Sequence, residues 1–184
     1  MIEQFDVNVL GLMDVTRAIL PHFRANRSGV IVNISSGAGV FGLPSLSLYN
    51  ASKFAVEGFS ESLSYELAGP GIAVKIVEPG GVTSTGFVAR SGAEAARTAE
   101  MSDYLPFKKA MEAVFTQLRA ARGGATSEGV PEVIYTAATD DSDQLRYVGT
   151  DDIKPLVAAR RNTSEAEYMA FMRERFAPRL DKAI

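Results

Sequence analysis

Two apolar runs, separated by a stretch of helical length, constrain the fold of this chain most strongly. The runs are Val30 to Ile34 (VIVNI) and Ile72 to Val77 (IAVKIV), and both are rich in β-branched residues. Runs of this kind are typical of strands buried on both faces of a parallel sheet. The stretch between them predicts a helix from about Leu46 to Ala68, which Gly69-Pro70-Gly71 ends. Strand, helix and strand in this order predict an α/β fold with a parallel sheet and right-handed crossovers.

Apolar periodicity and turn residues predict the remaining elements. They are a helix over 4–27, a helix over 106–122, a helix over 131–138, a strand over 145–148 and two terminal helices. Pro21 is expected to bend or fray the first helix, because it interrupts the backbone bonding. The second terminal helix is expected to start at Ser164, with Glu167 completing a capping box. The first strand would have an unpaired edge that exposes its backbone groups.

Length and composition are those of an ordinary globular domain. The 184 residues suffice for one core, with 46% apolar and 22% charged residues. The net charge of −3 gives no electrostatic reason to expect nucleic acid, and without cysteine there is no disulfide or thiolate metal site. His22 is interpreted as a partly exposed helix residue. No stretch is long and apolar enough to span a membrane and no signal-peptide pattern is present, so we expect a cytoplasmic protein without membrane partners.

A hydroxyl, a phenol and an ammonium group follow the first predicted strand in an order that suits proton transfer. Ser36 lies in the turn after the strand, and Tyr49 and Lys53 share a helical face four residues apart. An ordinary phenol has a pKa near 10 and is a poor acid or base at neutral pH. Because a nearby ammonium stabilises the phenolate, we expect Lys53 to lower the pKa of Tyr49 toward the range of acid–base catalysis.

A tyrosine and a lysine at this spacing also occur by chance on solvated helices. The context favours a site, because the preceding segment VIVNISSGAG is a strand that ends in small, polar residues. Open α/β sheets place their sites at the carboxyl ends of such strands.

Motifs at these positions resemble those of the short-chain dehydrogenase/reductase family. Asn8 in FDVNVLG resembles the family's catalytic asparagine, and Ser36 ends a segment similar to the strand of the catalytic serine. Tyr49 to Lys53 (YNASK) resembles the YxASK signature, and Glu78 to Val82 (EPGGV) resembles the PG motif near the nicotinamide. Nearly the whole chain takes part in the resemblance, including QLRYVGTDD, which looks like the family's last sheet strand.

The resemblance implies an oxidoreductase that transfers hydride between NAD or NADP and a small alcohol or carbonyl substrate. Tyr49 would exchange a proton with the substrate oxygen, and Ser36 would donate a hydrogen bond to it. Lys53 would lower the Tyr49 pKa, and Asn8 would hold a water that links Lys53 to solvent. The residues implied to contact the cofactor are Tyr49, Lys53, Pro79, Gly80, Val82 and Ser84.

The family also implies architecture and assembly. Residues 1–184 would form one partial Rossmann-like domain of three layers, with a substrate loop at about 83–124. Relatives bury the helices that carry Asn8 and Tyr49 in their main subunit interface, which implies a homodimer or homotetramer. The family's TGxxxGxG and NNAG motifs are absent from this sequence, so the chain is expected to match the carboxyl-terminal two-thirds of a typical member.

One glycine motif is interpreted as a false match. Gly37 to Gly42 (GAGVFG) satisfies GxGxxG after a predicted strand. A dinucleotide loop needs a helix that opens inside the motif, so that its amides meet the pyrophosphate. Here Leu43-Pro44-Ser45 follows instead, and a flexible turn at the site is the expected role.

Three functions remain open at this point. The chain is an oxidoreductase, or a catalytically inactive remnant that serves as an oligomerisation module, or an acid–base site for a ligand without nicotinamide. Apolar residues of the expected substrate loop either line a substrate pocket or pack the loop onto the sheet; they are Phe87, Met101, Tyr104, Phe107 and Met111.

Overall fold

The computed structural model of the chain describes residues 2–81, 86, 102–121 and 129–177. These residues fall into two compact units. The first combines the described residues of 1–80 with those of 128–158 and contains the sheet. The second combines the described residues of 81–127 with those of 159–184.

The sheet has three parallel strands in the order β1-β2-β3. They are β1 (Gly29–Ile34), β2 (Ile72–Glu78) and β3 (Arg146–Val148). β2 is central, with Ile34 of β1 opposite Val77 on one side. On its other side Ile76 lies opposite Arg146 of β3. The predicted α/β class and parallel pairing are confirmed.

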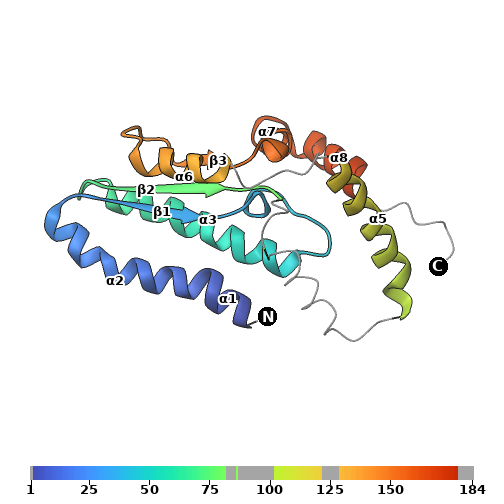
Figure 1. Cartoon of the computed structure of the whole chain (residues 1–184), viewed down its shortest axis with the longest axis horizontal. Coiled ribbons are helices and arrows are strands. Elements are labelled where there is room, and N and C mark those ends of the chain that lie inside the picture. Colours follow the sequence, from blue (N-terminus) through green and yellow to red (C-terminus); the bar gives the residue numbers. More distant parts are fainter. Residues whose placement is uncertain (1, 82–85, 87–101, 122–128, 178–184) are drawn as a thin grey trace. The chain divides into compact units, whose positions relative to one another are not determined.

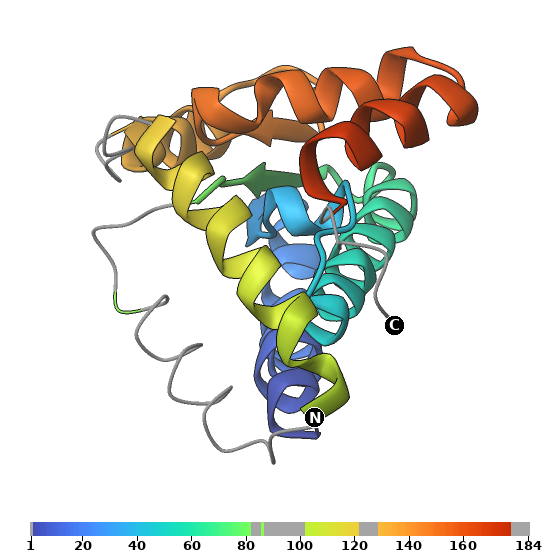
Figure 2. The same ribbon diagram turned by 90° about the vertical axis from the view of Figure 1, so that its right-hand side faces the viewer.

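Helices cover both faces of this sheet. A continuous helical stretch is made of α1 (Ile2–Phe5), a π-helical turn (Asp6–Leu10) and α2 (Gly11–Asn26). α2 and α3 (Ser47–Leu67) lie on one side of the strands, and α6 (Gly129–Thr139) lies on the other (Figure 1). Figure 2 shows the same layers from the side toward which β1 and β2 point.

The predicted first helix extends through its proline. α2 continues past Pro21 to Asn26, and Arg27 ends it in the left-handed conformation with a φ of 48°. Early fraying at Pro21 was therefore a wrong expectation. The helix retains its amphipathic packing here, because Leu20 and Phe23 pack against the core.

The core occupies both faces of β2. Toward α3, one cluster consists of Ile31, Leu63, Leu67, Ile72 and Val74. Toward α6, a second cluster consists of Val77, Ala137 and Tyr147. A buried polar contact adds to the first layer, because Asn33 Nδ2 donates to Ser60 Oγ at 2.8 Å and so ties β1 to α3.

The expectation that β1 is covered on both faces is wrong. Val30 and Ile34 are 42% and 39% exposed, although Ile31 and Asn33 of the same strand are buried. Alternate strand residues face opposite sides of the sheet. On the side of α6 the middle residue Val32 packs against the cluster of Val77, Ala137 and Tyr147, whereas Val30 and Ile34 at the two ends are exposed.

The remaining helices are α5 (Leu105–Ala121), α7 (Lys154–Asn162) and α8 (Glu165–Phe176). The predicted capping box at the start of α8 is confirmed, with Ser164 and Glu167 bonded in both directions. None of the described helices is long and apolar enough to cross a membrane.

Replacing Ile76 by alanine should test the central position of β2. Ile76 is fully buried, so Ile76→Ala should lower the free energy of unfolding by about 2–5 kcal/mol through lost burial and a residual cavity. Val30→Ala, at a half-exposed position of β1, is the matched control and should cost much less. Urea unfolding followed by circular dichroism measures both, and equal losses would contradict the assigned core.

Candidate active site

The ends of β1 and β2 lie side by side and form the floor of the candidate site. The Ser35 amide donates to the Val77 carbonyl at 2.8 Å, and the Gly37 amide donates to the Pro79 carbonyl at 2.8 Å. The Ser36 hydroxyl donates to the same Pro79 oxygen at 3.4 Å. Parallel strands bring their carboxyl ends to one edge, which is why segments distant in sequence meet here.

The turn after β2 is fixed by β3 and the residues that follow it. The Gly80 amide donates to Thr150 Oγ1 at 2.8 Å, and the Gly149 amide donates to the Glu78 carbonyl at 2.7 Å. A Cβ atom on Gly80 would collide with Thr150 and Asp152, so only glycine permits this close approach. The Pro79-Gly80 turn therefore has a defined conformation.

α3 brings Tyr49 and Lys53 to the end of β1. Both residues lie in the first two turns of this helix, and both are partly buried. The Lys53 ammonium donates to the Ile34 carbonyl at 3.0 Å and lies 5.9 Å from the centre of the Tyr49 ring. The Tyr49 side chain shares a hydrogen bond with Ser36. Tyr49, the residue predicted to exchange a proton, thus lies beside Ser36 and Lys53, the two residues predicted to assist it.

Asn8 joins this group through a serine. It lies in the π-helical turn Asp6–Leu10, and such turns occur frequently at functional sites. Its Nδ2 donates to Ser52 Oγ at 3.1 Å, and Ser52 Oγ donates to the Tyr49 carbonyl at 2.8 Å. Asn8 is therefore linked to the backbone of the helix turn that carries Tyr49.

Burial shifts both titratable groups of the site toward their neutral forms. It raises the pKa of Tyr49 above 10.0, although the hydrogen bond from Ser36 acts in the opposite direction. It lowers the pKa of Lys53 below 10.5, although the charge of Glu57 acts against this. The shift of Tyr49 is opposite to the predicted one, because loss of solvation of the phenolate outweighs its stabilisation by neighbouring groups.

The apparent dinucleotide motif does not form a phosphate loop. Gly37–Gly39 forms a buried 3-10 turn, and α3 begins only at Ser47, after the motif has ended. Gly39 packs so closely against Ser35, Glu57 and the Lys53 carbonyl that a side chain there would collide with them. The glycines of this motif therefore allow close packing onto α3. This agrees with the interpretation of the motif as a false match for a pyrophosphate loop.

Several of the expected residues are not described by the structure, and three others belong to the second compact unit. Val82, Ser84, Phe87 and Met101 are not among the described residues. Of the other apolar loop residues, Met111 is buried, and the rings of Tyr104 and Phe107 lie 4.6 Å apart. His22 is exposed on α2, which agrees with its interpretation as an exposed helix residue.

Three charged residues near the site escaped sequence interpretation. Arg146 of β3 contacts Glu57 of α3 and Glu78 of β2. The position of Glu57 four residues after Lys53 is a local signal, since both lie on one helical face. The participation of Arg146 has no local signal, because it lies 89 positions from Glu57 in sequence.

Comparison with known proteins places this geometry in a family. A family model for short chain dehydrogenases matches residues 1–96. An uncharacterised oxidoreductase of Schizosaccharomyces pombe is 37% identical over 171 residues, which cover 92% of this chain and 69% of that protein.

Solved structures agree in fold. A short-chain dehydrogenase from Streptomyces avermitilis superimposes with a TM-score of 0.67 at 26% identity, covering 92% of this chain and 59% of that one. ElxO with NADP bound gives a TM-score of 0.54 at 26% identity, covering 77% of this chain and 54% of that one. The chain thus spans between about half and two-thirds of the length of these proteins. On the family match and the relatives together, the chain belongs to the short-chain dehydrogenase family of oxidoreductases.

Proposed function

We propose that the chain transfers hydride between a nicotinamide dinucleotide, NAD or NADP, and an alcohol or carbonyl substrate. The observation that carries the proposal is the meeting of Ser36, Tyr49 and Lys53 at the joined ends of β1 and β2. A hydroxyl, a phenol and an ammonium group at one sheet edge can hold a substrate oxygen and exchange its proton.

Tyr49 is the proton-exchanging group in this proposal. Because burial raises its pKa, the phenol is protonated at neutral pH and can donate its proton to a carbonyl oxygen. Ser36 contributes a hydroxyl that bonds Tyr49, and its single proton can turn from the Pro79 carbonyl to the same substrate oxygen. A protonated Tyr49 favours carbonyl reduction at neutral pH, and this direction should weaken as the pH rises through the Tyr49 pKa.

The residues present fit the nicotinamide half of a dinucleotide. The Lys53 ammonium has three N–H donors, and one is directed to the Ile34 carbonyl, which leaves donors for ribose hydroxyls. When bound, the nicotinamide would supply the hydride, and the protein would orient the reactants and supply the proton. The bound NADP of ElxO supports this choice of cofactor class.

A second candidate function is a non-catalytic oligomerisation module. It is favoured by apolar side chains exposed on the helices that carry the predicted site: Val7 at 70%, Leu10 at 52%, Val15 at 71%, Phe54 at 43% and Tyr65 at 71%. Contiguous exposed apolar patches mark interaction surfaces. We propose that these two helical segments pair copies of the chain as a homodimer or homotetramer. Light scattering at several concentrations should give a multiple of the 19.7 kDa chain mass, and a monomer throughout would refute the pairing.

Nucleotide binding tests the cofactor assignment before any substrate is known. Titration of the full chain with NADH and NADPH, followed by nucleotide fluorescence, should show saturable binding. Lys53→Met should weaken it about tenfold or more, since a charged hydrogen bond contributes roughly 1.5–3 kcal/mol. Lys154→Met removes an exposed lysine and is the control that should bind like the parent. Unchanged affinity in Lys53→Met would exclude the ribose contact, and the absence of binding in the parent would favour the oligomerisation module.

Removal of the Tyr49 hydroxyl tests the chemistry. Tyr49→Phe should lower turnover about 10²- to 10⁴-fold, the usual contribution of general acid–base catalysis, with nucleotide affinity nearly intact. Tyr135→Phe, at a tyrosine exposed on α6, is the control and should match the parent. Steady-state assays over a panel of ketones and alcohols measure the effect. Turnover of Tyr49→Phe within about tenfold of the parent would reject the assignment.

A further inference from the structure

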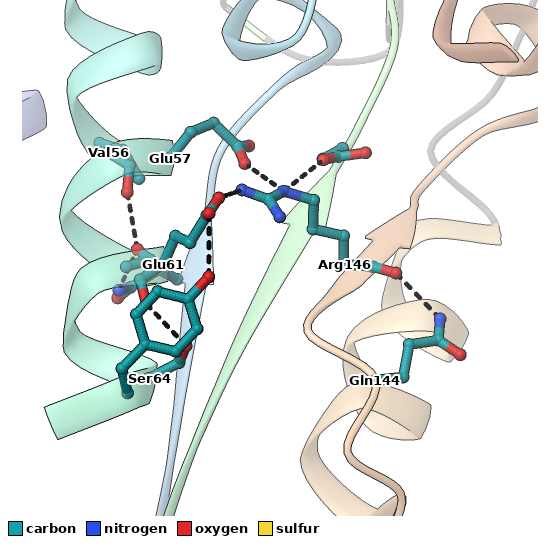
Figure 3. A network of polar contacts seen from close by, with 10 residues as sticks. Val56, Glu57, Glu61, Ser64, Gln144 and Arg146 are labelled. Atoms are coloured by element: carbon teal, nitrogen blue, oxygen red, sulfur yellow. Dashed lines mark hydrogen bonds and ion pairs between the residues drawn. The ribbon is translucent and has the colours of Figure 1, made fainter. Parts of the chain in front are cut away.

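A group of four charged residues lies next to the candidate site, on α3 one turn after Lys53 and on the neighbouring strands β2 and β3. Arg146 Nε of β3 donates to Glu57 Oε2 of α3 at 3.0 Å and lies 3.7 Å from Glu78 Oε1 of β2. Its Nη2 pairs with Glu61 of α3. Figure 3 shows Glu57 and Glu61 directed from their helix toward the guanidinium of Arg146. One cation therefore links its own strand, β3, to α3 and to β2.

The burial of this group makes the arginine necessary. The side chain of Glu78 is fully buried and that of Glu57 is 8% exposed, whereas Arg146 is 27% exposed. Buried carboxylates are costly unless a charged or hydrogen-bonding partner compensates them. Ile76 and Glu78 project from the same face of β2, and Arg146 lies opposite Ile76, so the register of the sheet directs Arg146 toward both glutamates.

Glu57 and Glu78 each lie next to a part of the candidate site, the first on the same helical face and the second in sequence. Glu57 follows Lys53 by one helical turn, and its charge favours the ammonium form of that lysine. Glu78 is bonded through its own carbonyl to Gly149 and is followed at once by the Pro79-Gly80 turn. The two arms of the candidate site, the α3 helix and the turn after β2, are thus joined at a single guanidinium.

We propose that Arg146 is a positioning residue of the active site, which holds the helix of Tyr49 and Lys53 against the Pro79-Gly80 turn by a hydrogen bond to Glu57 and an ion pair with Glu78. This inference rests on the proposed function. The planar guanidinium has several donors in a rigid fork and can bridge carboxylates on different elements. A lysine at this place would keep the charge and three donors but lose the rigid planar fork, so it would not fix the carboxylates in one geometry.

The test compares Arg146→Lys with Arg17→Lys in the full chain. Arg17 pairs with Asp14 on the exposed face of α2, which provides a matched arginine–carboxylate contact away from the site. In Arg146→Lys the amides of Gly37, Gly80 and Gly149 should exchange their hydrogens about tenfold faster or more, because the strand ends open locally. Amides inside the β1–β2 ladder should be unaffected. These measurements by NMR do not depend on activity.

Turnover supplies the second measurement. Carbonyl reduction at 25 °C by Arg146→Lys should fall about tenfold to a hundredfold, since small misplacements of reacting groups have effects of this size. The melting temperature, measured in parallel, shows that the variant is folded at the assay temperature. A purely structural residue would leave turnover of the folded variant unchanged.

A second variant covers the case in which Arg146→Lys fails to fold. Arg146→Met combined with Glu57→Gln and Glu78→Gln removes the buried charges with nearly equal volume, and should fold because the one carboxylate that loses its partner, Glu61, is 42% exposed. It should still show fast exchange at the three glycine amides and slow turnover.

The outcomes separate this inference from the proposed function. Exchange and turnover equal to those of Arg17→Lys would overturn the positioning role, as would a loss of turnover that follows only the unfolded fraction. Fast glycine exchange with lowered turnover supports it. If the parent binds no nucleotide and reduces no ketone, the proposed function fails, and the role of Arg146 in catalysis fails with it. The hydrogen-exchange result still decides whether Arg146 holds the two elements together.

Discussion

The parallel pairing of β1 with β2 is the constraint on which the rest of the structure depends. It sets Ile34 opposite Val77 and continues past both strands, where Gly37 bonds Pro79. A shift of one residue would turn every following side chain to the other face of the sheet. The present register places the Ser36 hydroxyl and the Pro79-Gly80 turn at the same edge, so the hydrogen bonds that stabilise the sheet also assemble the site.

Small and polar side chains attach α3 to this sheet. Ser60 is fully buried in the helix and accepts a hydrogen bond from Asn33 of β1. The Lys53 bond to the Ile34 carbonyl belongs to the same interface. Buried polar groups of this kind are stable only when they are paired, and paired groups permit few alternative arrangements. The position of Tyr49 is therefore a consequence of helix packing and not of a flexible loop.

The fold and much of the site could be predicted from local sequence. β1, β2 and α3 begin and end within one or two residues of their predicted bounds, because β-branched runs and the Gly69-Pro70-Gly71 stop are local signals. Ser36, Tyr49 and Lys53 could be found in the same way, since a strand end and one helical turn determine their spacing. The exposure of Val30 depends on how far α6 extends over β1, which no local pattern encodes.

Tertiary contacts explain what escaped prediction. The direction of the Tyr49 pKa shift depends on how deeply α3 packs, and spacing to Lys53 alone suggested the opposite direction. The π-helical turn that carries Asn8 has no recognisable sequence pattern. Arg146 meets Glu57 and Glu61 only because β3 pairs with β2 at Ile76. Interactions between residues far apart in sequence follow from the completed fold.

The transfer of isotope from cofactor to product tests the central claim most directly. The full chain would be incubated with NADPH or NADH that carries deuterium at both positions of C4 of the nicotinamide, together with a panel of aliphatic and aromatic ketones. The account predicts an alcohol with deuterium on the carbinol carbon, detected by mass spectrometry, and none when protein is omitted. Saturable nucleotide binding with no labelled alcohol from any ketone would contradict it.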